Sequence, residues 1–139
     1  NQPMRTVFDR FDQELFEYLL PDFPKMTLIQ FDGSKENDLV HIRIEVFQGI
    51  DWISEITEES IEENVCYFVD EGQTLPWPLK KWRHQHVVRA LDHRGAVIED
   101  QIEFSSGYAI LDLILFPILY LAFYPRRKAY KEYFGKYEK

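Results

Sequence analysis

The sequence predicts a single α+β domain spanning residues 1–139, in which one or two short N-terminal helices and a long C-terminal helix accompany an antiparallel sheet. Three observations lead to this prediction. Through the middle of the chain, apolar and polar residues alternate with period two, as in half-buried strands. Helical spacing is confined to the two ends of the chain. The 139 residues are enough to bury one core but not two.

The N-terminal segment carries the first helical pattern. Its large apolar residues recur at helical spacing: Phe8, Phe11, Leu15 and Leu19. Pro21 follows directly, where a helix would end. We predict a helix over residues 9–20, preceded by a short extended piece over residues 5–8. The prolines at 21 and 24 then predict an irregular link.

Six strands are predicted between the helices, each bounded by turn residues or by an interruption of the alternation. Their ranges are Thr27–Phe31, His41–Phe47, Trp52–Thr57, Asn64–Asp70, Lys81–Leu91 and Gly95–Phe104. Pro76 and Pro78 separate the fourth strand from the fifth, because proline cannot donate to a sheet ladder. The last two strands are joined by a turn over residues 92–95.

The last third of the chain is predicted to be one long helix. Residues 108–124 are apolar on all sides except for Asp112, and residues 126–134 are amphipathic with several cations. Pro117 is expected to bend this helix or to mark its start. The apolar half has 17 residues, against about 20 for a membrane span. We therefore favour burial of both flanks beneath a curved sheet over spanning.

Composition excludes several classes of function. A net charge of -8 without a basic stripe argues against nucleic-acid binding. The single cysteine, Cys66, excludes an internal disulfide framework and favours a reducing, cytoplasmic setting. No signal-peptide pattern is seen. The 11 Phe, 8 Tyr and 3 Trp exceed what a filled core of this size needs, which favours a pocket wall.

The strand over residues 81–91 places Trp82, His84 and His86 on one face, which a dry core would not choose. Asp100, on the next strand, shares its face with apolar residues and is expected beside the histidines. The opposite faces carry Arg83, Gln85 and Arg89 against Glu99, Gln101 and Glu103, a charge complement typical of a solvated surface.

Three kinds of chemistry are compatible with His84, His86 and Asp100. The three residues form a candidate metal site, since two histidines and a carboxylate bind zinc or iron. One histidine oriented by Asp100 would serve acid/base catalysis. The favoured interpretation is a paired polar patch that orients the head group of a ligand or stiffens the sheet. We therefore expect neither a metal nor a cofactor.

Several short segments resemble the START-like superfamily, also called the polyketide cyclase/dehydrase and lipid transport or Bet v 1-like group. They resemble most its bacterial cell-division-inhibitor-like, ligand-binding branch. The segments are Leu75-Pro76, Pro78-Leu79, Trp82–His86, Ile98–Phe104, Phe123, Arg126-Arg127 and Tyr130. The resemblance implies a helix-grip fold, in which a long helix lies across a curved antiparallel sheet and encloses an elongated apolar cavity. It does not imply a particular reaction.

We therefore expect the domain to bind a small hydrophobic or amphipathic molecule, lipid-like or aromatic, in an internal cavity. The residues expected to line it are Ile42, Ile44, Val46, Trp52, Trp82, Ile102, Phe104, Leu113, Phe116, Tyr120 and Phe123, with His84, His86 and Asp100 at a polar end. One alternative is a cyclase, dehydratase or hydrolase that uses a histidine with Asp100. The other is docking on a membrane surface or a protein partner through the apolar helix, whose cations Arg126, Arg127, Lys128 and Lys131 follow it.

Overall fold

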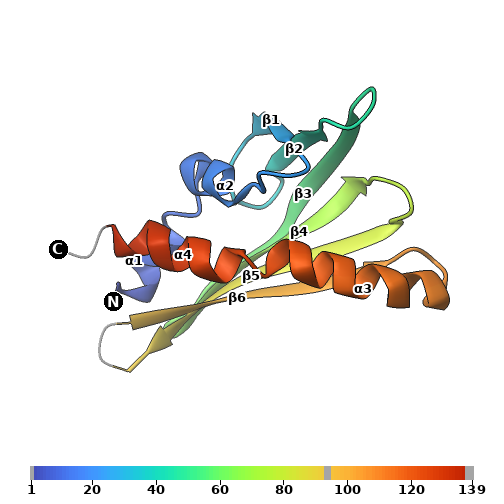
Figure 1. Ribbon diagram of the computed structural model, residues 1–139. Helices are drawn as coiled ribbons and strands as arrows, with labels where there is room; N and C mark the ends of the chain where they lie inside the picture. Colours follow the sequence, from blue (N-terminus) through green and yellow to red (C-terminus); the bar gives the residue numbers. More distant parts are fainter. Residues whose placement is uncertain (1, 93–94, 137–139) are drawn as a thin grey trace.

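The computed structural model describes residues 2–92 and 95–136, which form an α+β domain (Figure 1). Two short helices come first: α1 (Met4–Phe8) and α2 (Gln13–Leu19). The strands are β1 (Met26–Phe31), β2 (Leu39–Ile44), β3 (Ile50–Ile61), β4 (Val65–Thr74), β5 (Lys81–Leu91) and β6 (Gly95–Ser105). The chain ends in α3 (Ala109–Phe123) and α4 (Arg126–Gly135). Residues 93 and 94 of the predicted turn lie outside the described part of the chain.

In the described part of the chain, the strands form one open antiparallel sheet in the order β1-β2-β3-β4-β5-β6. Each strand thus pairs with its sequence neighbours, as the short connections require. The β5–β6 ladder is unbroken from Lys81 opposite Ser105 to Leu91 opposite Gly95. The predicted class and the existence of all six strands are confirmed, although β3 and β4 run several residues beyond the alternation that predicted them.

The hydrophobic core lies between the sheet and three of the helices. Its members come from α1, the link to α2, α2, α4 and strands β3, β4 and β5: Val7, Phe8, Phe11, Leu15, Ile56, Cys66, Phe68, Val88, Tyr130, Tyr133 and Phe134. The amphipathic α4, and not the more apolar α3, therefore closes the core. Figure 1 shows α3 and α4 crossing in front of β5 and β6.

The prediction for the N-terminus was wrong in detail. Residues 5–8 are helical, and Val7 and Phe8 are buried against the sheet. The second helix begins at Gln13, not at residue 9, because the side chain of Asp12 accepts a hydrogen bond of 3.0 Å from the backbone N–H of Leu15. Such a cap starts a helix and fixes its first turn.

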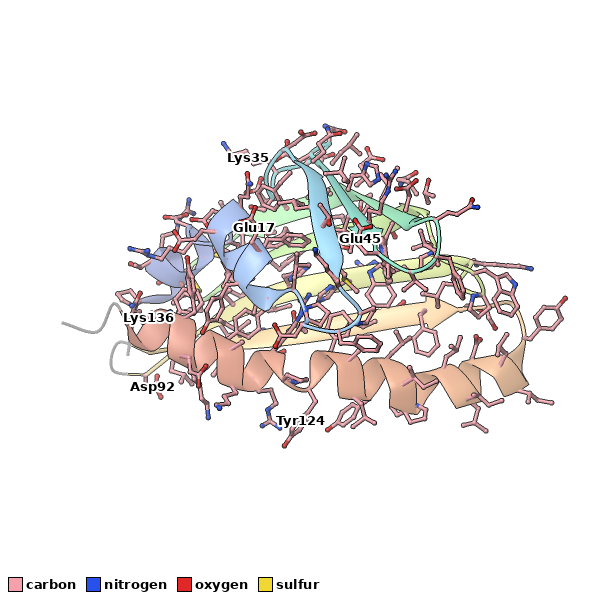
Figure 2. The ribbon with its side chains drawn as sticks, turned by 45° about the horizontal axis from the view of Figure 1, so that its top comes forward. Glu17, Lys35, Glu45, Asp92, Tyr124 and Lys136 are labelled. Atoms are coloured by element: carbon pink, nitrogen blue, oxygen red, sulfur yellow. The ribbon has the colours of Figure 1, made fainter. Side chains whose placement is uncertain are left out.

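The prediction that both flanks of α3 are buried was also wrong. No residue of α3 is buried. One row of side chains is half-buried toward the sheet, namely Leu111, Leu115, Leu119 and Phe123, and Asp112 in the first turn is half-buried as well. In Figure 2, Tyr124 at the end of α3 points away from the sheet. Pro117 lies inside α3, and the break before α4 falls at Tyr124 and Pro125. One helix on one face of a sheet has its opposite side free, whatever its composition.

The buried face of α2 and the exposed face of α3 can be compared by substituting one leucine on each. Leu15 lies in the core and is 1% exposed. Leu15→Ala is expected to lower the free energy of unfolding by about 2–5 kcal/mol. Leu113→Ala, at a residue 75% exposed on α3, is expected to change it by less than about 0.5 kcal/mol. Urea unfolding followed by far-UV circular dichroism measures both. A cost for Leu113→Ala equal to that of Leu15→Ala would contradict the exposed position of α3.

Candidate functional site

Two buried histidines on β5 form the centre of the candidate site. His84 and His86 are 3% and 8% exposed, and their ring centroids are 3.7 Å apart. They share the inward face because strand side chains alternate with period two. The neighbouring strands each bring a carboxylate to them: Asp70 of β4 lies opposite His84, and Asp100 of β6 lies opposite His86.

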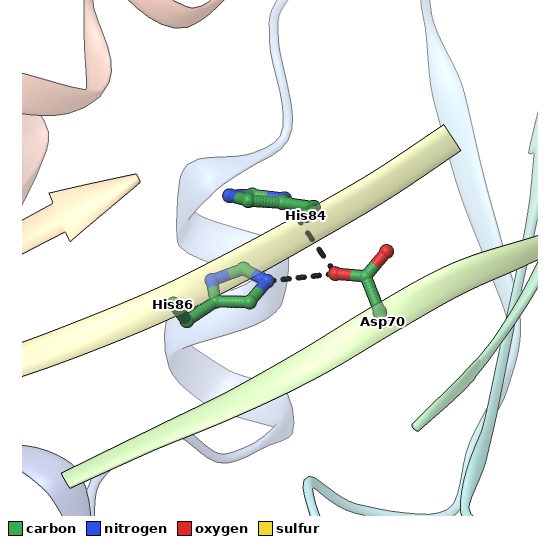
Figure 3. A group of neighbouring side chains, drawn as sticks. All are labelled: Asp70, His84 and His86. Carbon is green, nitrogen blue, oxygen red and sulfur yellow. Dashed lines mark hydrogen bonds and ion pairs between the residues drawn. The ribbon is translucent and has the colours of Figure 1, made fainter. Parts of the chain in front are cut away.

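The hydrogen bonds run diagonally rather than directly across the ladder. His84 Nε2 lies 2.9 Å from Asp100 Oδ1, and His86 Nε2 lies 2.8 Å from Asp70 Oδ2. The second nitrogen of each ring faces the other carboxylate: His84 Nδ1 is 3.5 Å from Asp70 Oδ2, and His86 Nδ1 is 3.5 Å from Asp100 Oδ1. Figure 3 shows both rings directed at Asp70. We call these four residues the histidine–aspartate cluster.

The C-terminal helices cover the cluster from the side opposite the sheet. The hydroxyl of Tyr130 on α4 donates to Asp100 Oδ1 at 3.3 Å, and Arg126 Nη1 lies 3.9 Å from the same oxygen. The ring of Phe123 meets that of His84 edge-on at 5.4 Å and lies beneath the guanidinium of Arg126. The polar groups of the site are therefore held by three strands, β4, β5 and β6, and by α4.

Burial sets the protonation of the cluster. It lowers the pKa of His84 to about 4, assisted by the neighbouring His86. Burial acts to raise the pKa of Asp70 and Asp100, yet the hydrogen bond that each accepts from a histidine and the charge of Arg126 bring both below the ordinary value. At neutral pH the cluster thus holds two carboxylates and a neutral His84.

Two hollows border the cluster. The inner cavity, of about 230 Å³, lies between the sheet and helices α2 and α3, and Asp70, His84 and His86 form its polar wall. The outer groove, of about 910 Å³, lies between β6 and helices α3 and α4, and Asp100 reaches it. Leu119 and Phe123 line both hollows and so separate them.

The structure distributes the expected lining residues between the two hollows. The inner cavity takes Ile42, Trp52, Trp82, His84, His86 and Phe123. The outer groove takes Asp100, Ile102, Phe104, Phe116, Tyr120 and again Phe123. Ile44, Val46 and Leu113 line neither hollow. Val46 follows the end of β2, and Leu113 is on the side of α3 away from the sheet, where it is 75% exposed.

The sequence argument correctly paired a histidine with Asp100 but missed Asp70, Arg126 and Tyr130 as members of the site. Asp70 had a usable pattern: it continues the inward alternation of Cys66 and Phe68 on β4. The sequence predicts a strand that ends at Asp70, and it assigns the carboxylate of this last residue no role. Arg126 and Tyr130 come from α4, whose position over β5 no local pattern specifies.

The arrangement limits the chemistry of the cluster. Both Nε2 atoms are hydrogen-bonded to a carboxylate, and each Nδ1 lies 3.5 Å from a carboxylate oxygen. This leaves little room for the direct contact with a substrate that general-base catalysis requires. A metal site is better supported geometrically. Asp70, His84 and His86 each offer one ligand atom within 4.8 Å of the others, so Asp70 takes the place in which the sequence hypothesis had put Asp100.

Comparison with known proteins gives no match: no family model, no curated protein and no solved structure is significantly similar to this chain. The class of protein is therefore defined by fold and site. It is an α+β domain whose open antiparallel sheet carries a buried histidine–aspartate cluster between two hollows.

The stability of the domain is expected to fall on acidification. The unfolded imidazole has a pKa of about 6.5 and that of folded His84 is about 4, so between these values the unfolded chain binds more protons. Stability is then lost as the pH falls through this window. The lowered pKa values of Asp70 and Asp100 extend the loss to lower pH.

Urea unfolding in EDTA measures this dependence. From pH 7 to pH 4.5 we expect the free energy of unfolding to fall by an amount on the order of 1–2 kcal/mol. The decrease should be smaller in His84→Gln, because this variant has no imidazole to protonate at that position. His41→Gln is the matched control, since His41 pairs with Asp51 at 2.9 Å on a more exposed part of the sheet. If the free energy of unfolding of His84→Gln falls as much as that of the wild-type protein, His84 is not the source of the pH dependence.

Proposed function

We propose that the protein binds a small hydrophobic or amphipathic molecule, with its apolar part in the inner cavity and its polar end at the histidine–aspartate cluster. The observation that carries this proposal is the cavity of about 230 Å³ beside buried, charged side chains. Protein interiors leave few voids larger than a water molecule. Ligand sites combine such a hollow with a small number of polar groups.

The walls of the inner cavity favour an aromatic or aliphatic occupant. Leu15 and Phe68 come from the core, and Trp52 and Trp82 meet edge-on at 4.8 Å between ring centroids. The volume is below the roughly 300–1,000 Å³ of sites for drug-sized ligands. It suits one ring system or a short chain, with the polar end of the ligand at Asp70, His84 and His86.

The layout of sheet and helices supports the START-like resemblance as the framework of this proposal. An antiparallel sheet with a C-terminal helix across it is compatible with a helix-grip arrangement. In that arrangement the space between helix and sheet is the ligand site. An aspartate oxygen lies within 3.5 Å of every ring nitrogen of His84 and His86, which favours binding over the cyclase, dehydratase or hydrolase alternative.

Native mass spectrometry of the purified protein, followed by organic extraction, tests the proposal directly. We expect a co-purifying molecule or saturable binding of the fluorescent probe N-phenyl-1-naphthylamine. Ala122 on α3 lines the inner cavity, so Ala122→Trp is expected to weaken binding at least tenfold by filling the space. Ala109→Trp, on the same helix but away from the cavity, is the control. No bound molecule, together with no binding of the probe or of fatty acids, would refute the proposal.

A second candidate function, docking on a membrane surface, is favoured by the exposure of α3. The solvent-facing apolar residues run along the helix without a charged interruption: Tyr108, Ile110, Leu113, Ile114, Phe116, Ile118, Tyr120, Leu121 and Tyr124. The one acidic residue of α3 is Asp112, and its carboxylate accepts hydrogen bonds from the backbone N–H of Ser106 and the hydroxyl of Ser105. A contiguous apolar face of this kind marks an interaction surface.

The position of α4 favours lying on a bilayer over crossing it. The helical stretch Ala109–Gly135 is long and apolar enough to cross a membrane by length and composition. However, Tyr130 and Phe134 of α4 are buried in the core. The remaining 15 residues of α3 extend about 22 Å, less than the bilayer core of about 30 Å. The exposed cations Arg127 and Lys128 follow at the level of anionic head groups.

Aromatic side chains at one end of the sheet extend this surface. Phe47 in the β2–β3 loop is 102% exposed, Trp77 in the β4–β5 loop is 90% exposed, and Tyr108 before α3 is 67% exposed. All three loops lie at the same end because the strands are antiparallel neighbours, as Figure 1 shows. Aromatic rings at such positions are typical of contact with the membrane interface.

Vesicle flotation tests the docking. The protein is expected to float at low salt with phosphatidylcholine vesicles that contain phosphatidylserine, and Leu113→Asp is expected to reduce the bound fraction several-fold. Leu91→Asp is the matched control, because Leu91 is 52% exposed at the far end of β5. Protein that stays soluble with these vesicles would refute docking. A dimer found by light scattering and abolished by Leu113→Asp would assign the surface to a second copy of the chain.

A further inference from the structure

Asp70, His84 and His86 each place one ligand atom beside the inner cavity, and these three atoms lie within 4.8 Å of one another. Asp70 Oδ2 lies 2.8 Å from His86 Nε2 and 3.5 Å from His84 Nδ1. Figure 3 draws both contacts as dashed lines. In tetrahedral zinc sites the metal–ligand distances are about 2.1 Å, which places neighbouring ligand atoms about 3.4 Å apart. The three atoms are therefore close to a coordinating arrangement before any metal binds.

The other ring nitrogens have the partner that metal-bound histidines require. His84 Nε2 and His86 Nδ1 both face Asp100 Oδ1, at 2.9 and 3.5 Å. In metal sites the free N–H of each ligating histidine donates to a carboxylate or carbonyl, which fixes the ring and raises its basicity. Tyr130 and Arg126 in turn hold Asp100.

One buried atom indicates that the metal-free arrangement is incomplete. His86 Nδ1 is buried and has no hydrogen-bond partner among the described residues. A neutral imidazole carries a single N–H; if that N–H is at Nε2, it donates to Asp70 and Nδ1 is left without a partner. A cation at Nε2 would move that proton to Nδ1, where Asp100 Oδ1 is positioned to accept it.

The charges and surroundings of the cluster also suit a divalent ion. Arg126 offsets the charge of Asp100, which leaves the carboxylate of Asp70 for the metal. Asp70, His84 and His86 all line the inner cavity, so a fourth coordination position would face that cavity. Two imidazoles and one carboxylate with an open position are a ligand set for zinc or ferrous iron.

We infer that Asp70, His84 and His86 bind a divalent transition-metal ion of the zinc class, with Asp100 as the outer carboxylate shared by both histidines. Metal binding does not depend on the proposed cavity ligand. It is measured on ligand-free protein, so its failure and the failure of the proposed function are separate results.

Titration of the full chain after EDTA treatment tests the inference, with Co²⁺ followed by its visible absorption and Zn²⁺ by calorimetry. We expect one ion per chain and the absorption bands of four-coordinate Co²⁺. Asp70→Asn and His86→Gln are each expected to weaken binding at least a hundredfold. Asp100→Asn is expected to weaken it by about 10–100-fold, the usual effect of losing an outer partner.

His41→Gln is the control for these variants, because it removes a histidine paired with an aspartate elsewhere on the sheet. It is expected to leave binding unchanged. Circular dichroism checks that each variant is folded, and imidazole ¹⁵N shifts of the wild-type protein test coordination at His84 Nδ1 and His86 Nε2 without any variant. Absence of saturable binding, unshifted imidazole nitrogens, or equal loss in His41→Gln would overturn the inference.

Discussion

The structure depends on the need to satisfy four ionisable side chains that the sheet carries into its interior. Because β5 alternates, placing Trp82 inward also places His84 and His86 inward, away from water. Unpaired, such groups would cost several kcal/mol each. Asp70 from β4 and Asp100 from β6 satisfy them, so the register of three strands is tied to one polar cluster. A slip of one residue in either ladder would bury the charged outer face instead.

This constraint explains why β5 and β6 were the best predicted part of the chain. Their alternation predicts directly which side chains are buried, and their short connection leaves one pairing to consider. The contact of a histidine on β5 with Asp100 therefore followed from the sequence, but not which histidine makes it. The bounds of β5 were predicted without error. Asp70 was missed for the opposite reason. The predicted strand ends at Asp70, whereas the observed strand continues to Thr74 through Glu71, Gly72 and Gln73, where no apolar residue carries the alternation further.

The C-terminal helices show the limit of hydropathy as a guide to burial. The apolar α3 contains no buried residue, while the polar α4 buries Tyr130, Tyr133 and Phe134. Burial depends on where a helix meets other elements, and α4 meets α1, α2 and the sheet together. An apolar composition indicates only that the surface is more stable when it is removed from water. It does not state whether the protein's own core or another molecule covers that surface.

Few contacts hold α3 on the sheet, in contrast to the other helices and strands of the domain. One end is tied to the sheet by Asp112 through Ser105 and Ser106, and the other end is interrupted at Pro125 before the anchored α4. Between these two tethers, only a half-buried row rests on the sheet. Raising α3 would therefore expose little core area, and it would remove Leu119 and Phe123 from the partition between the two hollows. The same movement that frees the helix for an outside surface would join both hollows into one compartment.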